Sequence, residues 1–171
     1  PEYLFSKYLW ITGTSETAIS YSKDFSERAL SLFKSNYEAL FVVEIASNDG
    51  TFLKEFQKRG CKVLGVDPAT NIAEIASKQG VPTIADFFSR ELAHKVLTET
   101  SSASLIYARN VIPHVKEIHS VISGIEILLS DDGIGVIEFH DAGLLLKEMH
   151  YDYIYHEHLF YFSLKTINGL L

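Results

Sequence analysis

The sequence predicts an α/β domain in which helices cover a mainly parallel sheet of about five strands. Short β-branched runs alternate with helical stretches along the chain. The stretch 42–53, VVEIASNDGTFL, passes from an apolar run through a small polar loop into a renewed apolar face, which indicates strand, tight loop and helix. A second run at 62–67 ends in an aspartate. Together they form a βαβ unit, and such units bind ligands at the carboxyl ends of their strands.

Composition limits the classes of function. With 171 residues, 47% of them hydrophobic, the chain is expected to form about one domain with a single core. A net charge of -7 without basic clusters argues against a nucleic-acid partner. The single cysteine, Cys61, allows no disulfide and favours the cytoplasm. No apolar run approaches the ~20 residues of a membrane span. We therefore expect a small-molecule partner and no membrane contact.

The N-terminal part, residues 1–36, is predicted to form an aromatic arm and a helix ahead of a core at 37–171. Tyr3, Phe5, Tyr8 and Trp10 crowd the arm, which is expected either to cover an apolar patch or to act as a lid over a cofactor. After the arm, apolar residues recur at helical spacing from Ser15, a candidate cap, to Phe33.

The loop after the first strand is a candidate cofactor cradle. Its candidate ligand-binding residues are Glu44, Ser47, Asn48 and Gly50. Asp67 ends the next strand, within the ~20 residues expected before a ribose-binding carboxylate. The loop lacks the G-x-G-x-x-G pattern, so it lacks the glycines that let the backbone approach the pyrophosphate of a dinucleotide. S-adenosylmethionine fits better, because its hydroxyl groups favour a carboxylate and its sulfonium tolerates an acidic surround.

Further elements follow in regular alternation. The predicted helices span 51–59, 71–79, from 86 through 93, 114–129 and 142–149, and the predicted strands span 82–85, 103–108 and 134–139. The amides that begin the helix at Thr51 could bind the carboxylate of the cofactor. Asp86 and Phe87 could bind adenine by hydrogen bonding and ring packing, although Asp86 could equally cap the following helix. Asp131-Asp132-Gly133 is predicted to be a turn.

Two sets of polar residues are candidates for the site. One follows a predicted strand, and the other lies where the alternation of strands and helices stops. Arg109 and Asn110 follow the fourth strand at its carboxyl end, and His114 lies at the predicted start of the next helix, where it is either a capping residue or part of a site. Residues 151–158 concentrate phenols, carboxylates and imidazoles, which can bind a sugar or move protons. On a strand His156 and His158 would share one face as metal ligands, but a third ligand is missing, so we expect no metal. Ser163 can cap a last helix.

Four segments, EIASNDGTFL, GVDPATNIA, ARNVIPHV and YDYIYHEHLFYFSL, resemble the C-methyltransferases that act on nucleotide-linked deoxysugars. The resemblance covers nearly the whole chain. It implies a Rossmann-like, S-adenosylmethionine-dependent methyltransferase fold of three layers, with S-adenosylhomocysteine as the product of the cofactor. The chain would then be a core that ends before the last strands of the sheet, and its open edge would favour a homodimer. One departure from the family is Ala46, which stands where the family usually has glycine.

The resemblance also implies roles for individual residues. It places Tyr155, Glu157 and His158 in the sugar site, which requires residues 151–158 to bend, because Tyr155 and His158 would face opposite ways on a straight strand. His158 is the predicted general base and His114 the runner-up, while Asn110 and Tyr155 would donate hydrogen bonds to the ketone oxygen. The further cofactor-binding residues are Ala46, Pro68, Arg109, Asn110 and Tyr8.

Three alternatives stay open at the level of sequence. The chain could methylate an oxygen or nitrogen atom instead of carbon. It could bind S-adenosylmethionine as a fragment that does not turn over alone. A dehydrogenase is a third alternative, which the missing glycines disfavour.

Overall fold

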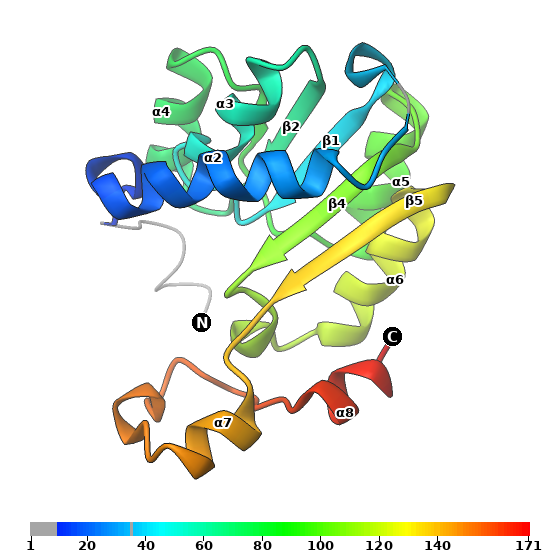
Figure 1. Cartoon of the computed structure of the whole chain (residues 1–171). Coiled ribbons are helices and arrows are strands. Elements are labelled where there is room, and N and C mark those ends of the chain that lie inside the picture. The colour runs from blue at the N-terminus through cyan, green and yellow to red at the C-terminus, as the bar shows by residue number, and fades with distance from the viewer. Residues whose placement is uncertain (1–9, 35) are drawn as a thin grey trace.

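A five-stranded parallel sheet lies at the centre of the computed structural model, which describes residues 10–34 and 36–171 (Figure 1). The strands are β1 Phe41–Ile45, β2 Lys62–Val66, β3 Thr83–Ile84, β4 Ala103–Arg109 and β5 Leu129–Glu138. Their order is β3-β2-β1-β4-β5 and every neighbouring pair is parallel. The order reverses at β1, whose two neighbours are β2 and β4. The predicted α/β class and parallel sheet are confirmed, and the carboxyl ends of the strands lie along one edge.

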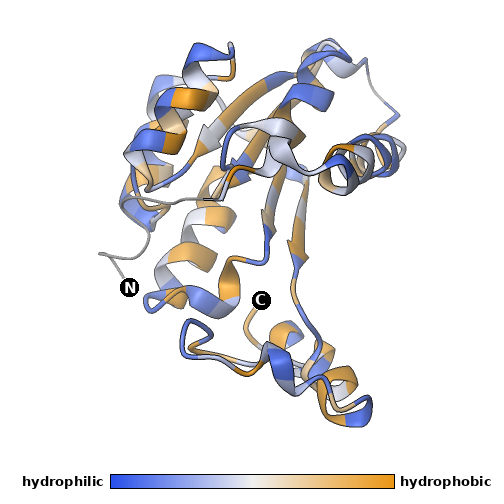
Figure 2. Cartoon of the chain, turned by 90° about the vertical axis from the view of Figure 1, so that its left-hand side faces the viewer, coloured by the Kyte–Doolittle hydropathy of each residue, from blue (hydrophilic) through white to orange (hydrophobic). Residues whose placement is uncertain are grey.

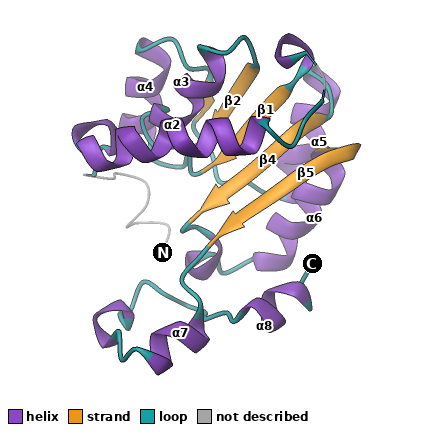
Figure 3. Ribbon diagram, viewed as in Figure 1, coloured by secondary structure: helices purple, strands orange, loops and turns teal. Residues whose placement is uncertain are grey.

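Helices cover both faces of the sheet and extend beyond its carboxyl edge (Figure 3). The helices are α2 Glu16–Leu30, α3 Thr51–Gln57, α4 Thr70–Lys78, α5 Arg90–Glu99, α6 Ile118–Leu128, α7 Ala142–Lys147 and α8 Leu164–Asn168. Helices α2, α3 and α4 pack on one face, and α5 and α6 pack on the other. Short 3-10 turns lie at Thr12–Thr14 (η1), Tyr37–Ala39 (η2), Ile112–His114 (η3) and Tyr151–Tyr153 (η4).

The core forms because the side chains of a strand alternate between the two faces of the sheet. All five residues of β1 are buried. Val42 packs with α2 and α3 in one apolar cluster, whereas Val43 and Ile45 pack with α5 and α6 in the other. Figure 2 shows hydrophobic residues concentrated along the strands and alternating with polar ones on the helices. A strand that is apolar on both faces is typical of the middle of a parallel sheet.

The predicted helix caps at both ends of the chain are present. The Ser15 side chain accepts a hydrogen bond from the Ala18 amide at 3.2 Å, and α2 then ends at Leu30, earlier than the predicted Phe33. Ser163 forms a reciprocal capping box with Thr166 at the start of α8.

Two local predictions are wrong, and one of the alternatives left open for Asp86 is excluded. Residues 131–133 are not an isolated turn: they lie within β5 at a bulge, because Leu129 pairs with Ala103 while Ile134 already pairs with Leu105. His114 does not begin a helix, since it ends η3 and α6 starts only at Ile118. Asp86 does not cap α5, because Ser89 lies directly before that helix and accepts from the Leu92 amide.

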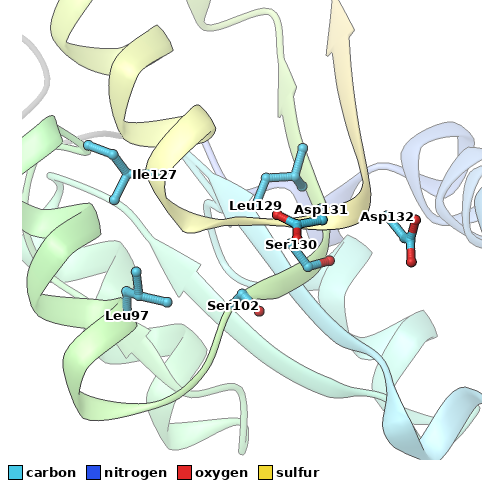
Figure 4. Close-up of a pocket in the computed structure, with 7 residues that line it drawn as sticks. All are labelled: Leu97, Ser102, Ile127, Leu129, Ser130, Asp131 and Asp132. Carbon is cyan, nitrogen blue, oxygen red and sulfur yellow. The ribbon is translucent and has the colours of Figure 1, made fainter.

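The bulge adjoins a small pocket of about 380 Å³ at the amino end of β5 (Figure 4). This is the end of the strand opposite to its carboxyl end. Within the described part of the chain β5 pairs with β4 alone. The predicted homodimer through this edge stays a prediction. No helix in residues 10–34 and 36–171 has the length and apolar character needed to cross a membrane.

The aromatic cluster between α2, α3 and the sheet is expected to contribute strongly to stability. Phe56 is 0% exposed and packs against Phe25 and Tyr107, with ring centres 6.2 and 5.6 Å away. Phe56→Ala should lower the free energy of unfolding by about 3–5 kcal/mol, because a buried cavity replaces the ring. Urea unfolding measures this loss. The matched control is Phe87→Ala at a ring that is 45% exposed, and equal losses in the two variants would contradict the packing described here.

Candidate active site

A cavity of about 1420 Å³ opens at the carboxyl edge of the sheet. Its wall takes residues from the ends of β1, β2, β4 and β5, from α2, from the segment before α5 and from residues 155–158. Sites for a single small molecule occupy about 300–1,000 Å³. This cavity therefore has room for a cofactor and a substrate side by side, where the sheet predicts ligand binding.

The loop at 46–50 is tied to the end of β2. The Asn48 amide donates to Asp67 Oδ2 at 2.8 Å, and the Ser47 amide donates to the Val66 carbonyl at 3.2 Å. Ala46, Asn48 and Gly50 all have positive φ values, of 55°, 49° and 75°. Glycine adopts this backbone without strain, whereas alanine loses about 1–2 kcal/mol there. Ala46 thus has a backbone conformation that glycine would adopt with less strain.

The same loop also holds the described end of the N-terminal arm. Asn48 Oδ1 accepts from the Thr12 amide at 2.8 Å, and its Nδ2 donates to the Trp10 carbonyl at 3.0 Å. Asp49 Oδ2 accepts from the Gly13 amide at 3.1 Å. Trp10 and Thr12 thereby reach the cavity wall. The lid role predicted for the arm stays a prediction, and Tyr8 lies outside the described residues.

Asp67 lies in the cavity wall beside Pro68 and is itself only 6% exposed. Its Oδ1 accepts from the Ala69 amide at 2.9 Å and its Oδ2 from Asn48. Burial raises the pKa of Asp67, and these two backbone hydrogen bonds oppose the rise. Each carboxylate oxygen keeps a second lone pair, so the group can still accept from a ligand hydroxyl.

Glu44 lies beneath the cavity rather than in its wall. It is 1% exposed and accepts from the Tyr107 hydroxyl at 3.0 Å and from Arg109 Nη2 at 3.1 Å. Burial raises its pKa to about 7, although Arg109 and Tyr107 act in the opposite direction. The Arg109 guanidinium also lies 3.1 Å over the centre of the Phe52 ring. Glu44 therefore anchors Arg109, and Arg109 forms part of the cavity wall.

Only one of the two residues predicted to bind adenine lies in the cavity wall. Phe87 lines the cavity with a ring that is 45% exposed, whereas Asp86 lies outside the wall and accepts a hydrogen bond from the Phe87 amide at 2.8 Å. Ser47 and Gly50 also lie outside the wall. In Gly50 an added Cβ would meet Val81 at 2.9 Å, so this glycine is required for loop packing.

The structure brings together two histidines that are 44 positions apart in sequence numbering, since the rings of His114 and His158 lie 4.6 Å apart. His114 Nδ1 lies 2.9 Å from the Glu157 carbonyl, and His158 Nδ1 lies 3.0 Å from the Tyr153 carbonyl. A carbonyl oxygen only accepts, so Nδ1 carries the proton in both rings and Nε2 is the basic nitrogen. Burial lowers the pKa of His114, which favours its neutral form.

Residues 151–158 bend, as the sequence predicted, and do not form a strand. After η4 the chain turns back, and the amides of Leu159 and Phe160 donate to the Pro113 carbonyl at 2.8 and 3.2 Å. This places Tyr155, Glu157 and His158 in the cavity wall with His114, and the Tyr155 and His158 rings lie 4.3 Å apart. The segment is not a strand, so His156 and His158 do not share a strand face. Across residues 10–34 and 36–171 no group of three or more metal-binding side chains is found.

Tyr21, Glu138 and His140 are among the residues of the wall that were not predicted as site residues. Tyr21 donates to Glu138 Oε2 at 2.5 Å, and Asn110 Nδ2 donates to Glu138 Oε1 at 3.2 Å. Glu138 could have been found from its place at the end of a parallel strand, as Asp67 was. Tyr21 gave no such signal, because its spacing in the helix fits an ordinary core position.

The strand order is that of a Rossmann-like domain, and the cavity at the strand ends with an acidic residue after β2 is typical of domains that bind an adenosine-containing cofactor. The chain belongs to the methyltransferase domain family, whose model matches residues 20–171. It is 34% identical over 167 residues to the C-methyltransferase NovU of Streptomyces niveus. That match covers 98% of this chain, which spans 40% of the length of the relative.

Solved structures support the same fold. A SAM-dependent methyltransferase from Archaeoglobus fulgidus gives a TM-score of 0.67 at 14% identity, over 86% of this chain and 66% of the other. The plantazolicin methyltransferase BpumL, in complex with a pentazolic desmethylPZN analogue and SAH, gives a TM-score of 0.66 at 13% identity, over 91% of this chain and 63% of the other. The predicted enzyme class and cofactor are confirmed: the chain is an S-adenosylmethionine-dependent methyltransferase domain.

The buried Glu44 should make stability depend on pH. Its pKa rises from the ordinary 4.5 to about 7 in the folded chain, so between these pH values the folded chain binds the proton more tightly. The contribution of Glu44 to the free energy of unfolding is therefore largest below pH 4.5 and falls as pH rises toward and through 7. Glu44→Gln, which stays neutral, should lose this slope in urea unfolding from pH 4.5 to 8. Parallel curves for the variant and the parent would contradict it; exposed Glu99→Gln is the control.

Proposed function

We propose that this domain transfers a methyl group to the carbon beside a ketone in a nucleotide-linked deoxysugar. The observation that carries the proposal is the pair of histidines with basic Nε2 atoms in the cavity that also holds Asp67 and Asn110. Carbon methylation is supported further by the 34% identity to a C-methyltransferase. The sugar substrate is supported by the resemblance of residues 151–164 to enzymes of that class.

The residues of the cavity fit S-adenosylmethionine. Asp67 would accept from the ribose hydroxyls, and the exposed ring of Phe87 would pack on adenine. Asp67, Glu138 and Glu157 give the wall an acidic character that suits a sulfonium cation. Asn48 and Arg109 would meet the polar end of the cofactor, since both are polar residues of the cavity wall.

The chain supplies the proton transfer and the hydrogen bonds. His158 Nε2 would take the proton from the carbon beside the ketone, so that the C–H pair forms the enolate double bond and the carbonyl pair moves to oxygen. Asn110 Nδ2 would donate to that oxygen as charge develops, with Tyr155 as a second donor. S-adenosylmethionine, when bound, supplies an electrophilic methyl group whose bond to sulfur breaks with both electrons remaining on sulfur. The enolate carbon forms the new bond.

We also propose a cytoplasmic location and a homodimer. The first rests on the use of one cysteine, Cys61, which is buried. The second rests on the edge of β5, whose other side has no strand partner in the described part of the chain.

Asp67 is expected to matter for cofactor binding. Asp67→Ala should weaken S-adenosylmethionine binding by about 10- to 100-fold, the loss expected for a hydrogen bond to a charged group. Isothermal titration calorimetry measures this affinity. The control is Asp131→Ala, an exposed carboxylate at the amino end of β5 (Figure 4). Because Asp67 also holds Asn48 and Ala69, Asp67→Asn tests the same site with one acceptor oxygen kept. Equal affinities in Asp67→Ala and Asp131→Ala would place the ribose elsewhere.

His158 is expected to be the general base. With S-adenosylhomocysteine in place of the methyl donor, the protein should exchange the hydrogen beside the ketone of nucleoside-diphosphate-linked keto-deoxysugars with deuterated water, followed by proton NMR. His158→Asn should abolish the exchange and leave cofactor affinity within about twofold, because the imidazole acts on the sugar.

Other outcomes assign the chemistry differently. Exchange that persists in His158→Asn and disappears in His114→Asn moves the base to His114. A methyl group found on oxygen or nitrogen by carbon NMR overturns the enolate mechanism. Cofactor binding without any exchange favours a binding fragment that does not turn over alone.

A further inference from the structure

Glu138 joins three elements at the edge of the cavity. Its two carboxylate oxygens are divided between two partners, with Oε2 accepting from the Tyr21 hydroxyl at 2.5 Å and Oε1 from Asn110 Nδ2 at 3.2 Å. The Asn110 amide also donates to the Glu138 carbonyl at 2.8 Å. Through one side chain, α2 is therefore connected to the ends of both β4 and β5.

Asn110 needs this support because its side chain is exposed. Its backbone has φ 53°, a left-handed conformation that is uncommon outside glycine, which fixes the direction in which the side chain leaves the chain. The amide group could still rotate. A carboxylate only accepts, so Glu138 selects the orientation in which Nδ2 faces it. The second N–H on Nδ2 then has a defined direction within the cavity wall.

Tyr21 keeps Glu138 in place. Its ring packs edge-on against Phe52, with centres 5.7 Å apart, and contacts Phe25 at 6.2 Å. Burial and the bond to Glu138 raise the pKa of Tyr21 to about 12. The phenol therefore stays protonated at neutral pH and continues to donate. Asn110 and Tyr21 each use their own oxygen of Glu138, so the two bonds do not compete.

We propose that Tyr21 and Glu138 are positioning residues, which orient the Asn110 amide so that its second N–H reaches the ketone oxygen. Helix α2 then contributes to the reaction through Tyr21. The inference rests on the proposed function, because the ketone oxygen is the group that Asn110 would bind.

A double-mutant cycle on the hydrogen-exchange reaction tests this proposal. Tyr21→Phe keeps the ring and removes the hydroxyl, so kcat for exchange should fall roughly tenfold, less than the ~100-fold expected when a donor is lost outright. KM for the keto-sugar should change less than about twofold. In an Asn110→Ala background Tyr21→Phe should have no further effect, since it acts only through that amide. An equal fall in both backgrounds, or an unchanged kcat in Tyr21→Phe alone, would overturn the proposal.

A second measurement does not depend on the substrate. The side-chain amide of Asn110 gives two proton resonances in a ¹⁵N correlation spectrum, and the one bonded to Glu138 should shift in both Tyr21→Phe and Glu138→Gln. Glutamine places its acceptor oxygen at only one of the two positions and an NH2 group at the other, so it cannot accept from both Tyr21 and Asn110 in this geometry. The matched controls are Tyr37→Phe on η2 and Glu99→Gln at the end of α5, both outside the cavity wall.

The two readouts separate the possible failures. If the unmodified protein exchanges no keto-sugar, the proposed function fails, while the amide resonances still report whether Tyr21 and Glu138 orient Asn110. If exchange occurs and those resonances do not move in either variant, the proposed function stands and the positioning role is wrong.

Discussion

The reversal of strand order at β1 is the constraint on which the rest of the structure depends. Chain connections leave β1 toward β2 over one face and reach β4 over the other, so the loops after β1 and β4 diverge and a crevice opens between them. The polar residues that follow these strands gather there because parallel strands end at one edge. Asp67, Arg109 and Glu138 come from three different strand ends and share one cavity for this reason.

A polar layer below this crevice gives it a defined floor. Glu44 of β1 holds Arg109 of β4, and Tyr107 adds a hydrogen bond to the same carboxylate. Burying a charge is unfavourable, and a paired charge reduces that cost only when its hydrogen bonds are satisfied. The benefit is positional: the guanidinium is fixed over Phe52, which belongs to α3. The floor therefore joins two strands and the helix after the cofactor loop.

Sequence reasoning succeeded where the signal was local. Strand and helix periodicity predicted the sheet. Asp67 was predicted at the strand ends because it is a carboxylate after the second strand of a βαβ unit, and it lies in the cavity wall. It failed where two signals competed. Ser89, rather than Asp86, is the cap of α5, and Asp131 has the polar neighbours of a turn although it lies in the bulge of β5. Tyr21 could not have been predicted, because its contact with Glu138 depends on how α2 lies across the ends of β4 and β5.

The two histidines are held by main-chain carbonyls, at Tyr153 and Glu157, and this has an evolutionary consequence. A point mutation replaces a side chain but leaves the carbonyl in place, so the proton on each Nδ1 is insensitive to most single substitutions at those two positions. An insertion or deletion between them would change the spacing of the two acceptors. During evolution, this part of the chain should therefore tolerate substitutions more readily than insertions or deletions.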